Sequence, residues 1–114
     1  MQLLCVIISK TDCVPVIVSE MLDKGYGDPT VLSCEGAMHL FENSSIEPPP
    51  IFGILRHIAN PIQTESKLML LVLPDEKLED AQKIIDEKIG GIDNPNTGIM
   101  FSLSINNVKG LATR

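Results

Sequence analysis

Aromatic residues and paired cysteines are scarce in this chain. Tryptophan is absent, and the aromatic residues are one tyrosine and three phenylalanines. The three cysteines, Cys5, Cys13 and Cys34, are an odd number without C-x-x-C or C-x-H spacing. Such a pattern supplies neither a disulfide framework nor a zinc knuckle. We therefore interpret the cysteines as small buried side chains of a protein in a reducing compartment.

Long apolar runs are missing as well. No run reaches the roughly 18 to 20 residues that a membrane-spanning helix needs. The apolar stretch of residues 3–8 is accompanied by neither a basic leader nor a small-residue cleavage site. We expect no membrane insertion and a cytoplasmic location.

Positive charge is sparse, because the net charge is −6 and the nine lysines and arginines are scattered along the chain. A negative net charge repels a phosphate backbone, so we expect no nucleic-acid partner. No serine lies in a G-x-S-x-G-like context, and no carboxylate pair stands apart from charged helix faces. The sequence therefore predicts a protein that is not an enzyme.

The chain is expected to form one domain, 1–114, because 114 residues with 44% hydrophobic content fill a single core. Residues 3–8 form a continuous apolar run typical of a buried strand. Asp12 is placed to cap a helix that ends at Gly25, and Thr30–Cys34 follows as a more polar strand. The apolar residues of this helix recur at helical spacing: Val14, Ile17, Val18, Met21 and Leu22.

The second part of the chain repeats this order. Residues 68–73 are again an apolar strand, Asp75 is the N-cap candidate of a second helix, and Gly90-Gly91 is expected to end it. The apolar stripe of that helix consists of Leu78, Ala81, Ile84, Ile85 and Ile89. In the last strand, apolar residues alternate with Met100, Ser102 and Ser104, as in a half-buried strand, and they are Ile99, Phe101, Leu103 and Ile105.

The order β-α-β, insertion, β-α-β predicts an α+β ferredoxin-like plait, with a four-stranded antiparallel sheet and two helices on one face. Two helices cover only one face of such a sheet, yet its first and third strands are apolar on both faces. Another copy of the chain is the simplest cover for the second face, so we expect a homo-oligomer.

The insertion, residues 38–66, is too long for a passive turn, and loops of that length are usually functional or disordered. Its proline run at 48–50 favours an extended segment, and apolar residues at 51, 54, 55 and 58 predict a short helix after it. We expect this loop to be partly packed, to change conformation when a ligand binds, and to contact a protein target.

Three short motifs resemble the PII family of nitrogen-regulatory signalling proteins. They are Leu71-Val72-Leu73-Pro74-Asp75, Gly90-Gly91-Ile92-Asp93 and Gly98-Ile99-Met100-Phe101. The resemblance implies a homotrimer that binds small effectors, often adenine nucleotides, in clefts between subunits. It also implies signalling through the long loop, in nitrogen or transport regulation.

The chain departs from the family in three places. Ile99 follows Gly98 where better-known members have a lysine. Where those members carry two arginines after the last strand, this chain has only Lys109 before Arg114. The long loop lacks tyrosine, since Tyr26 is the only one in the chain. The expected effector is therefore an adenine nucleotide or another small anion, and the cofactor is otherwise unknown.

The expected ligand site lies where the base of the 38–66 loop, the 90–98 loop and the tail meet. The 90–98 loop could form a backbone anion nest, but a helix stop followed by a turn explains it equally well. Arg56 is either an anion-binding group or a solvated surface residue. The candidate ligand-binding residues are Glu35, Gly36, Arg56, Lys67, Gly90, Gly91, Asp93, Gly98 and Lys109.

Two alternatives stay open. The first is a metal-responsive trimer of the divalent-cation-tolerance type, although Cys34, Glu35, His39 and His57 match no known metal-ligand spacing. The second is a protein-interaction module that binds no small ligand.

Overall fold

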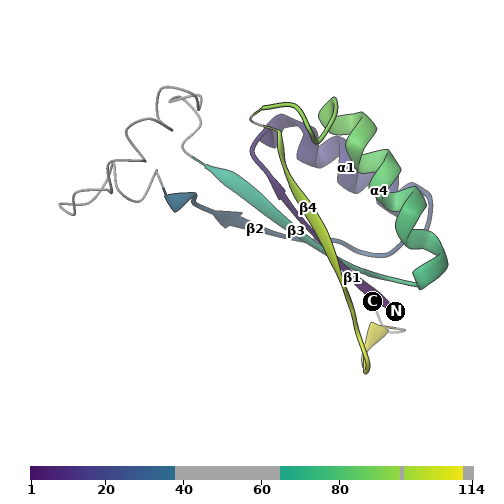
Figure 1. Ribbon diagram of the computed structural model, residues 1–114. Helices are drawn as coiled ribbons and strands as arrows, with labels where there is room; N and C mark the ends of the chain where they lie inside the picture. The colour runs from purple at the N-terminus through teal and green to yellow at the C-terminus, as the bar shows by residue number, and fades with distance from the viewer. Residues whose placement is uncertain (38–64, 96, 112–114) are drawn as a thin grey trace.

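The computed structural model describes residues 1–37, 65–95 and 97–111. Four strands and two α-helices follow one another along the chain (Figure 1). A short 3-10 helix, Thr11–Cys13, leads into the first of these helices. The elements are β1 (Gln2–Ile8), α1 (Val14–Asp23), β2 (Thr30–Cys34), β3 (Ser66–Leu73), α4 (Asp75–Ile89) and β4 (Gly98–Ser104).

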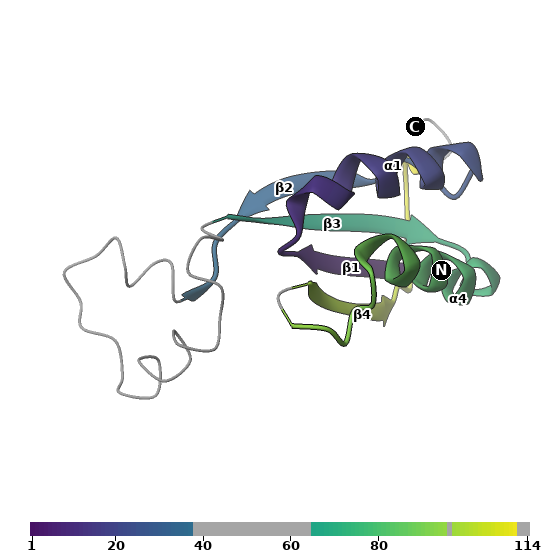
Figure 2. The same cartoon turned by 90° about the horizontal axis from the view of Figure 1, so that it is seen from above.

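The strands form one antiparallel sheet in the order β2-β3-β1-β4. Strand β1 pairs with β3 and with β4, and β2 lies at one edge beside β3. Both helices lie on the same face of the sheet (Figures 1 and 2). The α+β ferredoxin-like plait expected from the element order is thus confirmed.

The core lies between the helices and the sheet. Strand β1 contributes alternate residues to it, and β3 does the same, because successive side chains of a strand point to opposite faces. Ile17 and Met21 of α1 and Ile85 of α4 are fully buried against this face. The strand residues of the core are Leu4, Val6, Ile8, Met69, Leu71 and Leu73.

Two predicted helix caps are wrong. Neither Asp12 nor Asp75 caps a helix with its side chain: Asp12 lies inside the 3-10 helix, and Asp75 is the first residue of α4 after Pro74. Asp75 is still favourably placed, because a carboxylate in the first turn of a helix interacts with the positive end of the helix dipole. At the other end of α4, Gly90 adopts φ 89°, a left-handed C-cap that glycine accepts without steric cost, as predicted.

The apolar stripe of α4 is buried as predicted, apart from the half-buried Leu78. In α1 the prediction is wrong at Leu22, which is 52% exposed. The predicted insertion, 38–66, overlaps β3 by one residue, because β3 already begins at Ser66. Residues 38–64 lie outside the described part of the chain. Within the described residues, no helix is long and apolar enough to cross a membrane.

Candidate functional site

The sheet face opposite the helices carries large apolar side chains in register across neighbouring strands. One row joins Leu103, Leu3 and Val72 through the β4–β1–β3 pairing. A second row joins Phe101, Cys5, Leu70 and Thr30, and a third joins Ile99, Ile7, Leu68 and Leu32. We call these three rows the open face.

The open face corrects the interpretation of β4. The alternating apolar residues were expected to make a half-buried strand, but Ile99, Phe101 and Leu103 are 57%, 44% and 55% exposed. They point away from the helices because Met100, between them, packs against the core. The chain by itself leaves this apolar surface in contact with water, whereas isolated soluble proteins rarely expose contiguous patches of this kind.

One end of the sheet gathers several of the predicted ligand-binding residues. Lys67 pairs with Ile8 of β1 and with Ser33 of β2, and Ile8 in turn pairs with Gly98 of β4. The Lys67 Nζ donates to the Ser33 hydroxyl at 2.7 Å and lies 3.2 Å from a carboxylate oxygen of Glu65. The hydrogen bond from Ser33, followed by that from Lys67, lowers the pKa of Glu65. The lysine is thus held at the point where the chain of residues 35–65 returns to the sheet.

Glu35 and Gly36 follow β2 at this same end, and both are exposed. Arg56 lies outside the described residues. Lys109 is exposed in the tail beyond β4, whose last residue pairs with Gln2 at the opposite end of the sheet. A single chain therefore does not bring Lys109 and Lys67 together.

The loop after α4 forms several hydrogen bonds within itself and with the end of α4. The Ile92 N–H donates to the Asp86 carboxylate at 2.7 Å, and the Asn94 side chain donates to the Gly90 carbonyl at 2.6 Å. The buried Thr97 hydroxyl donates to the Ile92 and Asn94 carbonyls. These contacts favour the helix stop and turn over an anion nest, while Asp93 remains exposed on the loop.

Gly91 and Gly98 each have a structural reason to be glycine. A Cβ at Gly91 would lie 2.7 Å from the Asn94 side-chain nitrogen, and a Cβ at Gly98 would lie 2.2 Å from the Ile7 carbonyl oxygen. The second contact is with backbone, so it cannot be relieved by a side-chain rotation. Gly98 therefore allows β4 to start directly against β1.

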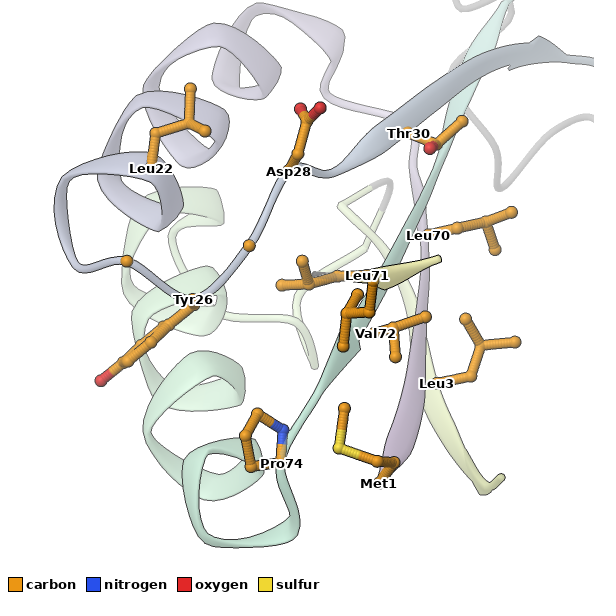
Figure 3. Close-up of a pocket in the computed structure, with 13 residues that line it drawn as sticks. Met1, Leu3, Leu22, Tyr26, Asp28, Thr30, Leu70, Leu71, Val72 and Pro74 are labelled. Atoms are coloured by element: carbon orange, nitrogen blue, oxygen red, sulfur yellow. The ribbon is translucent and has the colours of Figure 1, made fainter. Parts of the chain in front are cut away.

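A pocket of about 810 Å³ lies at the other end of the sheet, and the sequence did not point to it (Figure 3). It is bounded by the end of α1, the connection into β2, the last residues of β3 and the start of β1. Because β2 begins only opposite Leu70, the remaining part of β3 is paired with β1 on one side and has no strand on the side of β2. The residues that line it are Met1, Leu3, Leu22, Gly25, Tyr26, Gly27, Asp28, Thr30, Leu70, Leu71, Val72, Pro74 and Leu111.

No sequence pattern marks this pocket, since its walls come from four separate stretches of the chain and its polar groups follow no motif. The described residues also contain no group of three or more His, Cys, Asp or Glu side chains that could hold a metal ion. All three cysteines are free, with Cys5 and Cys13 buried as expected and Cys34 half-buried.

Comparisons with known proteins bear on the fold alone. No protein-family model matches the chain, and no curated protein matches it. Among solved structures, the chain is similar to that of a functionally unknown protein from Pediococcus pentosaceus ATCC 25745, with a TM-score of 0.61 and 11% sequence identity. The likeness covers 95% of this chain and 94% of that chain. At this identity the likeness establishes a shared fold.

Proposed function

We propose that this protein is a non-catalytic, PII-like regulatory subunit that assembles as a homotrimer through its open face. The observation that carries the proposal is the exposed apolar surface of β4, which continues across β1 and β3. Further copies of the same chain can cover such a surface and remove it from water, so no different protein is needed.

In this proposal, a small effector binds in the clefts between subunits, beside the end of the sheet that holds Lys67. A nucleotide or another small anion fits the positive charge there, and Lys67 would exchange its contact with Glu65 for one with the ligand. The adjoining segment, 38–66, would transmit binding to a protein target. The half-buried setting of Lys67 supports this role, because its ammonium group is already oriented by Ser33.

Sedimentation equilibrium tests the assembly. We expect a trimer for the natural chain and a folded monomer for Phe101→Asp, because a charge on the open face cannot be buried without a partner. Val16→Asp is the matched control, since Val16 is 51% exposed on α1, away from the sheet. A natural chain that sediments as a monomer at micromolar concentration would contradict the proposal.

Thermal-shift measurements with ATP, ADP, cyclic nucleotides and inorganic phosphate test the effector class. A ligand at 100 times its dissociation constant stabilises a protein by about 2.7 kcal/mol, which is readily detected. We expect Lys67→Met to lose the shift and Lys83→Met, on the exposed side of α4, to keep it. If none of these anions stabilises the trimer, the anion-sensing part of the proposal fails while the assembly stands.

A further inference from the structure

The pocket at the far end of the sheet is separate from the site proposed around Lys67. Lys67 pairs with Ile8 at the end of β1, whereas Met1 and Leu3 at its beginning line the pocket. The two places therefore lie at opposite ends of the same strands. The volume of the pocket falls within the range of about 300 to 1,000 Å³ that is usual for small-molecule sites.

The inner surface of the pocket is mainly apolar. Leu71 and Val72 of β3 lie between the segment that carries Leu22 and Asp28, on one side, and Leu3 on the other (Figure 3). Gly25 and Gly27 add no side chains, so part of the wall is backbone. This surface suits the hydrocarbon or aromatic body of a ligand.

The charge at the rim of the pocket determines which polar group of a ligand can bind there. Asp28 is the one charged side chain among the lining residues, and its carboxylate is directed away from Leu71 and Val72 (Figure 3). Within the described residues, no hydrogen bond or ion pair engages this carboxylate. It is therefore available to a cation that stands at the mouth.

The end of α1 adds to this field. Leu22 lies in the last turn of that helix and Gly25 just beyond its C-cap, where the dipole presents its negative pole, and the last turn contains no basic residue. Lys24 lies nearby, but it is paired with Asp80 at 3.6 Å and does not line the pocket. Lys109 in the tail and the amino group of Met1 do not reverse the balance. The first is not a lining residue, and the second is 3.0 Å from Asp75.

We propose that this pocket binds a small organic amine, with its apolar body against Leu3, Leu71 and Val72 and its ammonium group at Asp28. The same field disfavours phosphate- and carboxylate-bearing molecules, so the ligand differs in class from the anion proposed near Lys67. The proposal does not depend on the anion site proposed near Lys67, because Asp28 and Leu71 lie at the other end of the sheet and the ligand is of another class. The pocket does share Leu3, Thr30, Leu70 and Val72 with the open face, so further copies assembled there would border it.

A matched series of phenyl compounds tests the charge preference: 2-phenylethylamine, the neutral 2-phenylethanol and the anionic 3-phenylpropionate. Each is titrated to millimolar concentration while amide NMR shifts are followed. We expect the amine to shift Tyr26, Gly27, Asp28 and Leu71 most strongly, the alcohol less and the carboxylate least. The amide of Lys67 should stay unperturbed.

Two variants locate the effect. Asp28→Asn should weaken amine binding by about two- to fivefold, the range for one solvent-exposed ion pair, and leave the alcohol unchanged. Glu79→Gln is the control, because it removes the same charge from an exposed position on α4 outside the pocket. Equal shifts for amine and carboxylate, or an amine affinity unaffected by Asp28→Asn, would overturn the proposal. The proposal would also be overturned if the NMR shifts of the pocket amides did not change with any of the three compounds but changed with protein concentration, since a second copy would then fill the pocket.

Discussion

The hydroxyl of Tyr26 donates a hydrogen bond to the carboxylate of Asp80, and this bond ties the turn that follows α1 to α4. Lys24 lies 3.6 Å from the same carboxylate, and the Lys77 ammonium lies 5.9 Å from the centre of the Tyr26 ring. The two helices of the plait are thus joined by a polar contact at the margin of their apolar packing. Tyr26 is also next to the pocket, so this contact positions one of its walls.

Removing the Tyr26 hydroxyl should weaken the contact between the two helices and destabilise the protein. We expect Tyr26→Phe to lower the urea midpoint of unfolding, because Asp80 loses its hydrogen-bond donor while the ring and its contact with Lys77 are kept. Asp80→Asn and the double variant complete a thermodynamic cycle that isolates the pair. Additive effects of the two single changes would show that the hydroxyl and the carboxylate do not interact in solution.

The same pair should make stability depend on pH at both extremes. The hydrogen bond from Tyr26, with a smaller effect of Lys24, holds the pKa of Asp80 below its ordinary value of 3.8. This stabilisation is present above 3.8 and is lost as the pH falls through the folded-state pKa. The bond to Asp80 raises the pKa of Tyr26 above its ordinary value of 10.0, so its stabilisation is complete below 10.0 and is lost as the pH rises through the folded-state pKa.

Urea titrations of the natural protein and Tyr26→Phe at acidic, neutral and alkaline pH check this dependence. The difference between the two midpoints should be largest in the neutral range and should shrink at both ends. Other carboxylates titrate in both proteins and cancel in the difference. A difference that is constant across the whole range would exclude Tyr26 and Asp80 as its source.

A leucine-to-alanine substitution should depend on assembly on one face of the sheet and not on the other. Leu4 is fully buried against the helices, so Leu4→Ala should cost about 2 to 5 kcal/mol at any protein concentration. Leu103 is 55% exposed in the single chain, so Leu103→Ala should change the stability of a dissociated monomer by no more than about 0.5 kcal/mol. Its effect should grow with concentration if copies cover the open face. Denaturation at several concentrations separates the two cases.

Gly98→Ala should destabilise the start of β4. The added Cβ would overlap the Ile7 carbonyl oxygen at 2.2 Å, so β4 must move away from β1, at a cost of about 1 to 3 kcal/mol. Gly36→Ala is the control, because a Cβ at that position has no atom of the described residues within 4 Å apart from its own and neighbouring residues. Chemical denaturation measures the cost, and hydrogen exchange at residues 98–101 locates it. An unaltered exchange pattern would contradict this account of Gly98.

The fold could be predicted because each element has a local signature. The apolar runs of β1 and β3, the helical spacing from Ala81 to Ile89 and the glycines that follow are all visible in the sequence, and the order of elements then leaves few topologies. The caps failed because an aspartate before a helix is equally compatible with the first turn or with a 3-10 helix. The expected burial of β4 was wrong for another reason: alternation shows that one side of a strand is apolar, but not which side the helices cover.

The candidate sites depended on information that alternation and motifs do not contain. Lys67 and Gly98 were each selected separately, and their common row follows from strand register, which sets β1 between them. Lys109 was selected with them, yet β4 carries the chain to the far end of the sheet before the tail begins. The pocket could not be predicted at all, because Leu3, Asp28 and Leu111 have no pattern in common and meet only through folding.

Cys34, the last residue of β2, pairs with Ser66, the first residue of β3. The chain therefore leaves the sheet and re-enters it at neighbouring positions of one ladder, so the strand register does not depend on the length of what comes between. Doubling a connecting segment costs only about 0.6 kcal/mol in loop-closure entropy. The plait can thus act as a scaffold for insertion. A binding peptide or a small reporter domain whose ends lie close together could replace residues 38–64 without altering the sheet.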